Sequence, residues 1–509
     1  MSDGKSLAER FERWSTPLLI MVVVLAYLPS LSAGFLNWDD PWLVAENPVL
    51  ARASASDVVA IWTDFTLQRR MQLGAEYLPV RDMSHVVESH LFGLRPQALR
   101  LVNLGLYLGS IALLSRALRA VARDSWVALI ATWVFALHPV HVESVAWIAG
   151  RKDVLALLFV AAGMYSYARR GRGDVWWTAV CFALAALSKS MSVAAVALLP
   201  VLDVVADRKP RWSAIGAASL VVAVMLAVHA MVGRAVGMTT PLAGGNHVTA
   251  AATMGPVWLG YLACLVWPGS LSIVHDAPSR AAFDLPSVAG YLVLVAWGVL
   301  SVLAWRRSQR IVAVAFVVFL VPLAPVSQVL FGLQNRMADR YLWLSVLAAG
   351  LLLAGLWQRR RTLGAFLSVG FIVMWLGATA TRANLFASSQ RVFRDAVGKT
   401  KLSTVATYQL AQACEEQGRF DEAMAAYEET WRRFEINARE HPADVALQSE
   451  AARRATNNLA RLWAKAGDWE AAGRVLRRGL AYFPDDPKMR GNLAKVDAHS
   501  GDGAGEPKR

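Results

Sequence analysis

The sequence predicts an all-α protein in which a bundle of membrane-spanning helices is followed by a soluble helical tail. Hydrophobic residues make up 56% of the 509 residues and the mean hydropathy is +0.37, both above the range usual for soluble proteins. Apolar runs of about 17–25 residues, each long enough to cross a bilayer as a helix, recur from Pro17 to about Leu385. The residues after about Lys399 contain no such run and are rich in Glu, Arg and Ala.

The formal net charge of +14 does not indicate nucleic-acid binding, because of how the basic residues are distributed. Many occur in short groups between the apolar runs: Lys5/Arg10/Arg13, Arg116/Arg119/Arg123, Arg169/Arg170/Arg172, Arg208/Lys209/Arg211, Arg306/Arg307/Arg310 and Arg359/Arg360/Arg361. Groups at the ends of spans are cytoplasmic by the positive-inside rule. We therefore expect no nucleic-acid partner.

These basic groups also predict the topology, because two cytoplasmic groups must be joined by an even number of crossings. The count is about 11 spans, with the N-terminus cytoplasmic and the C-terminus outside. One stretch, residues 254–274, is ambiguous: it is either re-entrant or interfacial, or it hides a pair of spans, which would give about 13. We expect a membrane domain over 1–396, a helical domain over 397–500 and a disordered end over 501–509.

This topology places four polar sequences on the outer face. They are residues 37–96 within a first outer loop over 34–98, and residues 138–153, 188–192 and 334–340. Their basic residues oppose the positive-inside bias, and binding an anion would explain them. The candidates for an anionic group are Lys189, Arg340, Arg336 and Arg151.

The first outer loop begins with two adjacent carboxylates, Asp39 and Asp40, beside the end of the first apolar run. Carboxylates at a membrane surface are costly unless they have a use, so we expect a reaction centre here. A structural alternative is that one of them caps the helix that follows Pro41. Both interpretations hold if one carboxylate reacts and its neighbour caps.

His138, His141 and Glu143 form a second candidate group. Three interpretations stay open: a divalent-metal site that includes His141, Glu143 and Asp39; hydrogen bonds that support the acceptor or a phosphate; and a satisfied polar break in a buried helix. The sequence does not require a cofactor.

The tail contains two segments with one helical-hairpin pattern. The first has Thr407–Ala411, Gly418, Ala423 and Tyr427; the second has Thr456–Ala460, Trp463, Gly467, Ala472, Leu476 and Pro484. Leu-Ala in the first helix, Gly at the turn and Ala in the second helix are typical of tetratricopeptide (TPR) repeats. The spacing exceeds the usual ~34 residues, so we interpret residues 436–450 as an insertion that lengthens the helices. A generic antiparallel helix bundle is the alternative.

Several motifs follow one another in a fixed order along the chain. They are Phe35–Asp40, Glu46–Pro48, Tyr77–Val80, His138–Ala146, Gly150–Asp153, Ser188-Lys189 and Asp339–Leu342, with the TPR-like segments last. In this order they resemble the transmembrane and tetratricopeptide-containing (TMTC) mannosyltransferases and their bacterial relatives in the GT-C glycosyltransferase superfamily. Two positions depart from the family pattern: Leu78 stands where an arginine is usual, and Ser190 where a glutamate is frequent.

The resemblance implies a GT-C fold and transfer of a sugar from a polyprenyl-phosphate carrier on the outer face. An aspartate of the first outer loop would act as general base or align the acceptor, which maps onto Asp39 and Asp40. The outer-face cations would hold the carrier phosphate, and the tail would position a protein or glycan acceptor, as in O-glycosylation. The short tail and the Arg- and Ala-rich composition resemble bacterial proteins, which implies the inner membrane. The sugar, the acceptor and the oligomeric state are not predicted.

Two other functions compete with this one. A non-catalytic membrane scaffold would use the tail to recruit partners, but it has no need of ionisable residues gathered on one face. A transporter of a lipid-linked saccharide would carry them in mid-span, whereas here they cluster at the outer ends of the spans.

Overall fold

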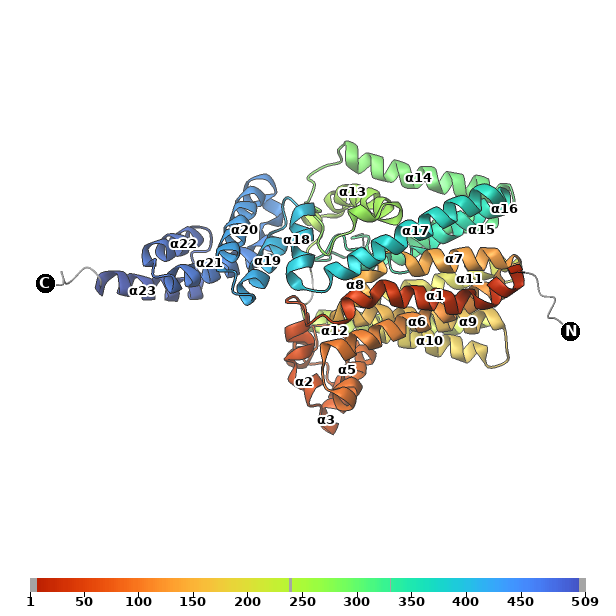
Figure 1. Ribbon diagram of the computed structural model, residues 1–509, viewed down its shortest axis with the longest axis horizontal. Helices are drawn as coiled ribbons and strands as arrows, with labels where there is room; N and C mark the ends of the chain where they lie inside the picture. The colour runs from red at the N-terminus through yellow and green to blue at the C-terminus, as the bar shows by residue number, and fades with distance from the viewer. Residues whose placement is uncertain (1–6, 238–239, 330, 503–509) are drawn as a thin grey trace. The chain divides into compact units, whose positions relative to one another are not determined.

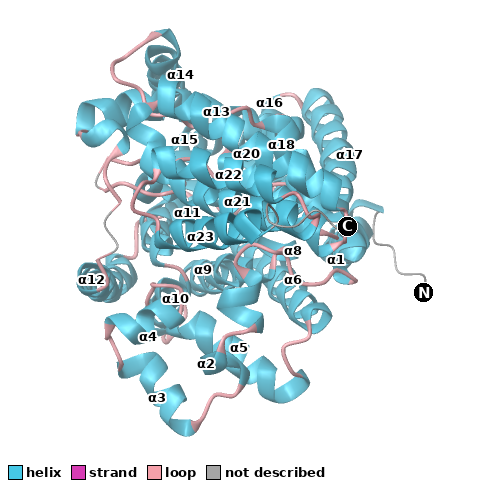
Figure 2. Cartoon of the chain, turned by 90° about the vertical axis from the view of Figure 1, so that its left-hand side faces the viewer, coloured by secondary structure: helices cyan, strands magenta, loops and turns pink. Residues whose placement is uncertain are grey.

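The computed structural model describes residues 7–237, 240–329 and 331–502, and within them the chain is all-helical. Figure 2 shows helices and loops but no strand in this described part. The residues divide into two compact units. The first comprises residues up to Leu242, Met254–Leu271 and Phe283–Ser388; the second comprises Ala243–Thr253, Ser272–Ala282 and the chain from Ser389 onward. Most of the predicted disordered end, residues 503–509, lies outside the described residues.

The long helices of the first unit pack along one another, as Figure 1 shows for α1, α6, α9 and α17. The bounds are α1 (Leu7–Leu31), α6 (Pro96–Val121), α7 (Ser125–Leu137), α9 (Arg151–Arg169), α10 (Asp174–Ser188), η3 (Ser190–Leu198), α11 (Leu199–Ala206), α12 (Trp212–Ala235), α13 (His247–Val266), α14 (Leu285–Arg306), α15 (Arg310–Leu323), α16 (Leu347–Arg359) and α17 (Arg361–Leu385). The described part contains six helices long and apolar enough to cross a membrane: α1, α6, α12, α13, α14 and α17. Shorter apolar helices accompany them, and the chain is a multi-pass membrane protein.

The segment predicted to be the first outer loop folds into short helices, which are η1 (Pro41–Ala45), α2 (Pro48–Ala51), α3 (Ala55–Thr63), α4 (Leu67–Gln72) and α5 (Pro79–Phe92). They share a small apolar core of Val49, Leu50, Ile61, Leu73 and Val86. Polar side chains fix the ends of these helices. Ser54 and Asp57 form a capping box at the start of α3, which satisfies backbone N–H groups that the first helical turn leaves free. The loop is therefore a folded element and not a flexible connection.

Short helical segments interrupt the bundle where the sequence predicted polar breaks. They are α8 (His141–Ala146), η2 (Ile148–Gly150), η6 (Ala324–Val326) and η7 (Asp339–Leu342), with η4 (Ala243–Gly245) and η5 (Pro268–Ser270) flanking α13. Lys189 separates α10 from η3. Irregular backbone at membrane depth is tolerated where it is buried in protein or lines a cavity. These breaks therefore mark the part of the bundle in which polar side chains can gather into a binding or catalytic site.

The second unit contains α18 (Ser389–Lys399), α19 (Thr404–Glu416), α20 (Phe420–Glu440), η8 (Pro442–Asp444), α21 (Val445–Lys465), α22 (Trp469–Tyr482) and α23 (Pro487–Asp502). Gly418 and Gly467 take positive φ at the turns α19–α20 and α21–α22, a conformation that favours glycine. Helices α20 and α21 are 21 residues each, which is where the chain exceeds the usual repeat length.

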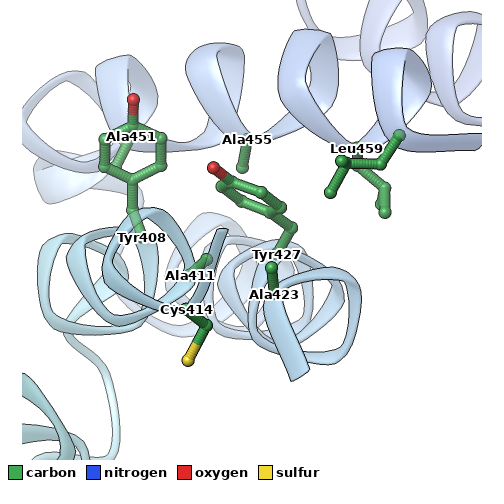
Figure 3. Packing of buried hydrophobic residues seen from close by; sticks show 9 residues of the cluster. Tyr408, Ala411, Cys414, Ala423, Tyr427, Ala451, Ala455 and Leu459 are labelled. Atoms are coloured by element: carbon green, nitrogen blue, oxygen red, sulfur yellow. The ribbon is translucent and has the colours of Figure 1, made fainter. Parts of the chain in front are cut away.

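Small side chains from three successive tail helices meet around Tyr427 (Figure 3). Ala411 of α19, Ala423 of α20 and Ala455 of α21 are fully buried there. A second cluster around Trp431 and Phe434 joins α20 to α21, α22 and α23. Alanine at these contacts lets the helix axes approach closely, so the Leu-Ala and Ala positions of the sequence pattern form the core of the tail.

Candidate functional site

The first outer loop is held against the segment 147–152 by residues on either side of Asp39. The indole rings of Trp38 and Trp147 stack with centroids 5.4 Å apart. Asp40 is fully buried, and its two carboxylate oxygens accept the backbone N–H groups of Leu36 and Ala149, each at 2.9 Å. Trp38 and Asp40 therefore act as two anchors, with Asp39 between them.

Asp40 does not cap the following helix, contrary to one of the expectations above. It occupies the N-cap position of η1, but its side chain makes no capping hydrogen bond. The carboxylate is instead directed at Ala149, 109 residues along the chain. Burial raises the pKa of Asp40 to about 6, although the N–H donors of Leu36 and Ala149 and the nearby Arg100 favour the charged form.

Asp39 is only half-buried and faces basic side chains. Its carboxylate accepts a hydrogen bond of 3.3 Å from the indole N–H of Trp42. Burial raises the pKa of Asp39, while Lys152 and Arg340 act in the opposite direction. A carboxylate with one weak hydrogen bond, two cations nearby and access to solvent is suited to take a proton from a hydroxyl group.

Two of the predicted cations form buried ion pairs. Lys189 pairs with Asp153, and its ammonium group lies 5.3 Å from the ring centroid of Trp343. Arg340 pairs with Glu143 at 2.6 Å, and its guanidinium lies over the rings of Trp147 (5.7 Å) and Tyr341 (5.4 Å). The second carboxylate oxygen of Glu143 is buried and has no hydrogen-bond partner. This oxygen leaves unused hydrogen-bonding capacity beside Arg340.

The other two predicted cations lie in different surroundings. Arg151 is fully buried and contacts Glu88 and Ser84 of α5, Asn103 of α6 and the Leu99 carbonyl oxygen. The guanidinium of Arg151 is therefore already bound by residues of the loop and of the bundle, and it joins these two parts of the chain. Arg336 is buried in the loop before η7.

The three residues of the predicted metal alternative do not converge on one point. His138 donates from Nε2 to the Leu265 carbonyl oxygen at 3.1 Å and accepts the Val140 N–H at Nδ1, a tautomer inferred from these partners. His141 lies between the rings of Phe135 and Tyr107 (4.5 and 5.2 Å), with Nε2 unpartnered. Within the described residues, Asp39, His141 and Glu143 do not bring ligand atoms together at the spacing of a shared ion.

Two residues beside Asp39 were missing from the predicted site. Lys152 and Glu76 form an ion pair of 2.7 Å, and both interact electrostatically with Asp39. Glu76 also lies 3.4 Å from Arg81, which is buried against Asp82 and the Leu73 carbonyl oxygen. The positive-inside bias marks Lys152 along with the other basic residues of the predicted outer face, but the sequence did not place it beside Asp39. No comparable signal marked Glu76.

Comparison with known proteins gives similarity over part of the chain. No family model matches. The chain is 31% identical over 189 residues to protein O-mannosyl-transferase TMTC2 of Mus musculus, covering 35% of this chain and 22% of that protein. It is 31% identical over 156 residues to TMTC1 of Homo sapiens (30% and 18% covered) and 26% identical over 196 residues to human TMTC3 (37% and 21%). The matches confirm the resemblance to the TMTC proteins, although the chain spans less than a quarter of the length of these relatives.

One solved structure is also similar, that of the Archaeoglobus fulgidus oligosaccharyltransferase tethered with an acceptor peptide. The identity is 14% and the TM-score 0.37, over 81% of this chain and 59% of that one. A similarity at this level supports no inference about function.

Proposed function

We propose that this relative of the TMTC proteins is a membrane glycosyltransferase that moves a sugar from a polyprenyl-phosphate donor to an acceptor hydroxyl on the outer face of a bacterial inner membrane. The observation that carries the proposal is the half-buried Asp39, fixed between the anchors Trp38 and Asp40 and facing Lys152 and Arg340. Neither a scaffold nor a transporter needs a carboxylate held in this way.

In the proposed reaction Asp39 accepts the proton of the acceptor hydroxyl as the oxygen bonds to the anomeric carbon. The bond between that carbon and the phosphate oxygen breaks, and its electron pair stays on the lipid phosphate. Lys189, Arg340 and Arg336 stabilise the charge that develops there. Asp40 and Arg151 position the outer loop and take no proton.

We further propose eleven crossings: α1, α6, α7, α9, α10, η3 with α11, α12, α14, α15, α16 and α17. The ambiguous helix α13 is then non-crossing. Its middle packs on the second turn of α14, because a Cβ on Gly290 would lie 1.9 Å from the Gly255 carbonyl oxygen. At its end, Leu265 accepts the hydrogen bond from His138, an outer-face residue.

Polar contacts within the second unit support the same topology. After α13, the Arg280 N–H donates to Thr253 Oγ in the second turn of α13 (2.9 Å), and Ser279 binds Asp444. Asp276 accepts from the backbone of Lys401 and Leu402. A non-helical segment cannot return through lipid, so both ends of α13 belong on the side of the tail. A reporter fused after Lys401 should be active only when exported, and so should one inserted at residue 277; opposite results at the two sites would contradict this topology.

For the tail we propose TPR-like hairpins that position the acceptor. The glycine turns and the alanine contacts of α19–α22 support this role. Tethering an acceptor beside the site would raise its local concentration without any chemistry in the tail. Disruption of the tail should therefore reduce transfer to the natural acceptor more than hydrolysis of the donor.

The experiment that tests the function compares Asp39→Asn with the unchanged protein in membranes supplied with a lipid-linked sugar. Transfer should be lost while insertion and expression are retained. Transfer at the original rate in Asp39→Asn, Asp40→Asn and the double variant would contradict the proposal. Mass spectrometry of glycans from a deletion strain would identify the sugar and the acceptor.

A further inference from the structure

The site contains one ion pair that differs from the others in exposure. The side chains of Lys189 and Asp153 are 6% and 1% exposed, and those of Arg340 and Glu143 are 10% and 0% exposed. Lys152 and Glu76, by contrast, are 26% and 29% exposed. Opening a buried pair leaves a charge without water or partner, whereas a partly exposed pair opens at lower cost because water can reach the separated groups. Lys152 is thus the cation beside Asp39 that can most easily change its partner.

Each member of this pair has a second anchor that remains when the pair opens. Glu76 lies 3.4 Å from Arg81, which is itself bound to Asp82 and the Leu73 carbonyl oxygen. Lys152 follows Arg151, the residue fixed by α5 and α6, in the first turn of α9. Separation of Lys152 from Glu76 therefore leaves both backbones in place, and only the lysine side chain has to move.

Lys152 is also unfavourably placed unless it has an anionic partner. The N-terminus of α9 carries the positive end of the helix dipole, and Lys189 and Arg340 add positive charge nearby. In this structure Glu76 supplies the compensating charge. A phosphate with a full negative charge at the same place would compete directly with the Glu76 carboxylate.

We propose that Lys152 and Glu76 form a displaceable ion pair: the phosphate of the lipid carrier takes Lys152 from Glu76 and so brings the leaving group to a cation that interacts with the base Asp39. This inference rests on the proposed function and adds a phosphate-binding residue and its counter-ion to it. When the sugar is transferred, the carbon–oxygen bond to the phosphate breaks, the phosphate retains the electron pair, and Lys152 stabilises it. Glu76 reclaims Lys152 when the carrier leaves.

Binding of undecaprenyl phosphate, which carries no sugar, tests this step independently of catalysis, with the alcohol undecaprenol as the uncharged control. Glu76→Gln should tighten phosphate binding roughly two- to fivefold, because the competitor is removed. Lys152→Met should weaken it by roughly fivefold or more, and Glu76→Gln combined with Lys152→Met should bind as weakly as Lys152→Met alone. None of the three should change binding of the alcohol.

Asp57 and Arg69 provide a matched control in the same outer loop. Their ion pair is 3.1 Å long, with side chains 26% and 21% exposed, but it lies outside the site. Asp57→Asn should leave phosphate binding unchanged. Equal phosphate affinity in the unchanged protein, Glu76→Gln and Lys152→Met would overturn the inference, as would equal affinity of the unchanged protein for phosphate and alcohol.

The pH dependence of kcat/KM supplies a readout that a purely structural role would not move. Asp39 is faced by Lys152, Arg340 and Glu76, with Asp40 beside it and Arg81 near enough to interact. Lys152 lowers the pKa of Asp39 and Glu76 raises it. The acidic limb, where the base becomes protonated, should therefore move to higher pH in Lys152→Met and to lower pH in Glu76→Gln.

The displaceable ion pair and the proposed function can be contradicted independently of each other. If Asp39→Asn abolishes transfer while the acidic limb and phosphate binding are the same in all Lys152 and Glu76 variants, the glycosyltransferase proposal stands and the displaceable pair is wrong. If Asp39→Asn, Asp40→Asn and the double variant all retain transfer, the proposed function is wrong whatever Lys152 does.

Discussion

The predicted outer face of the membrane unit, which we call the outer layer, comprises residues 37–96, 138–153, 188–192 and 334–340. This layer and the helical tail both contain many charged residues but use them in opposite ways. In the outer layer several pairs are buried and join distant segments: Arg340 and Glu143 are 197 residues apart, and Arg151 and Glu88 are 63 apart. In the tail many pairs link residues three or four apart on exposed helix faces, such as Glu450 with Arg454 and Glu470 with Arg474.

The difference indicates which region contains charges that stability alone does not explain. Buried charges are expensive and add little to stability compared with well-packed apolar residues, so a layer of them requires another explanation. Exposed pairs along a helix are solvated and each contributes little. The tail obtains its stability from alanine and aromatic contacts instead. The comparison therefore supports our proposal that the chemistry takes place in the outer layer and that the tail residues serve packing.

The sharpest test lies within the outer layer, between its two adjacent aspartates. Asp39→Asn should reduce kcat/KM by roughly 10²–10⁴-fold, the usual effect of removing a positioned base, without lowering thermal stability. Asp40→Asn should lower the melting temperature as well as the activity, because the amide can accept only one of the two buried backbone hydrogen bonds. Equal loss of stability in both variants would remove the distinction between a reacting and an anchoring carboxylate.

The second test removes one partner of a buried pair. Arg340→Gln leaves Glu143 buried without its cation and should destabilise the protein by about 3–5 kcal/mol in thermal or denaturant unfolding. Arg340→Gln combined with Glu143→Gln should recover much of this stability, because no unpaired charge remains. Transfer should stay low in both variants if Arg340 contacts the donor phosphate. Recovery of transfer together with stability would show that Arg340 is only structural.

The contrast between the regions also explains what the sequence could predict. Asp39 and Asp40 and the outer cations follow from local motifs and from the positive-inside bias, which are properties of short segments. The anchoring of Asp40, on which their proposed division of roles depends, does not, because its partner Ala149 lies 109 residues away. Glu76 was missed for the same reason: its partner Lys152 is 76 residues away. In the tail, glycine turns and alanine contacts are local, and the hairpins could be located from them.

Helix α13 is the clearest case in which composition alone was insufficient. Its 20 residues are apolar and long enough to span, and it is one of the six candidate helices. The proposal that α13 does not cross draws on the hydrogen bond of Leu265 with His138 and on the polar contact of Arg280 with Thr253. Neither contact leaves a periodic signal in the sequence, so composition by itself leaves about 11 and about 13 spans both open.

A third test moves to the tail and changes packing without changing charge. Ala455 is fully buried in the cluster with Tyr427 and Ala411. Ala455→Leu should overpack this contact and destabilise the tail by about 1–3 kcal/mol, seen as a lower melting transition in the full-length protein. Donor hydrolysis should be nearly unchanged and transfer to the natural acceptor reduced. Loss of hydrolysis in equal measure would mean that the tail contributes to the catalytic site.

The smallest effect on stability and transfer is expected for an exposed ion pair of the tail. Glu450 and Arg454 are paired at 2.7 Å, with side chains 64% and 61% exposed. Glu450→Gln should change stability by no more than about 0.5 kcal/mol, because water solvates both groups well when they are apart. Its charge change equals that of Glu143→Gln in the outer layer, which makes the two variants a matched pair. If Glu450→Gln reduced transfer as strongly as Glu143→Gln, the tail surface would take part in recognising a charged substrate, and the assignment of chemistry to the outer layer alone would be wrong.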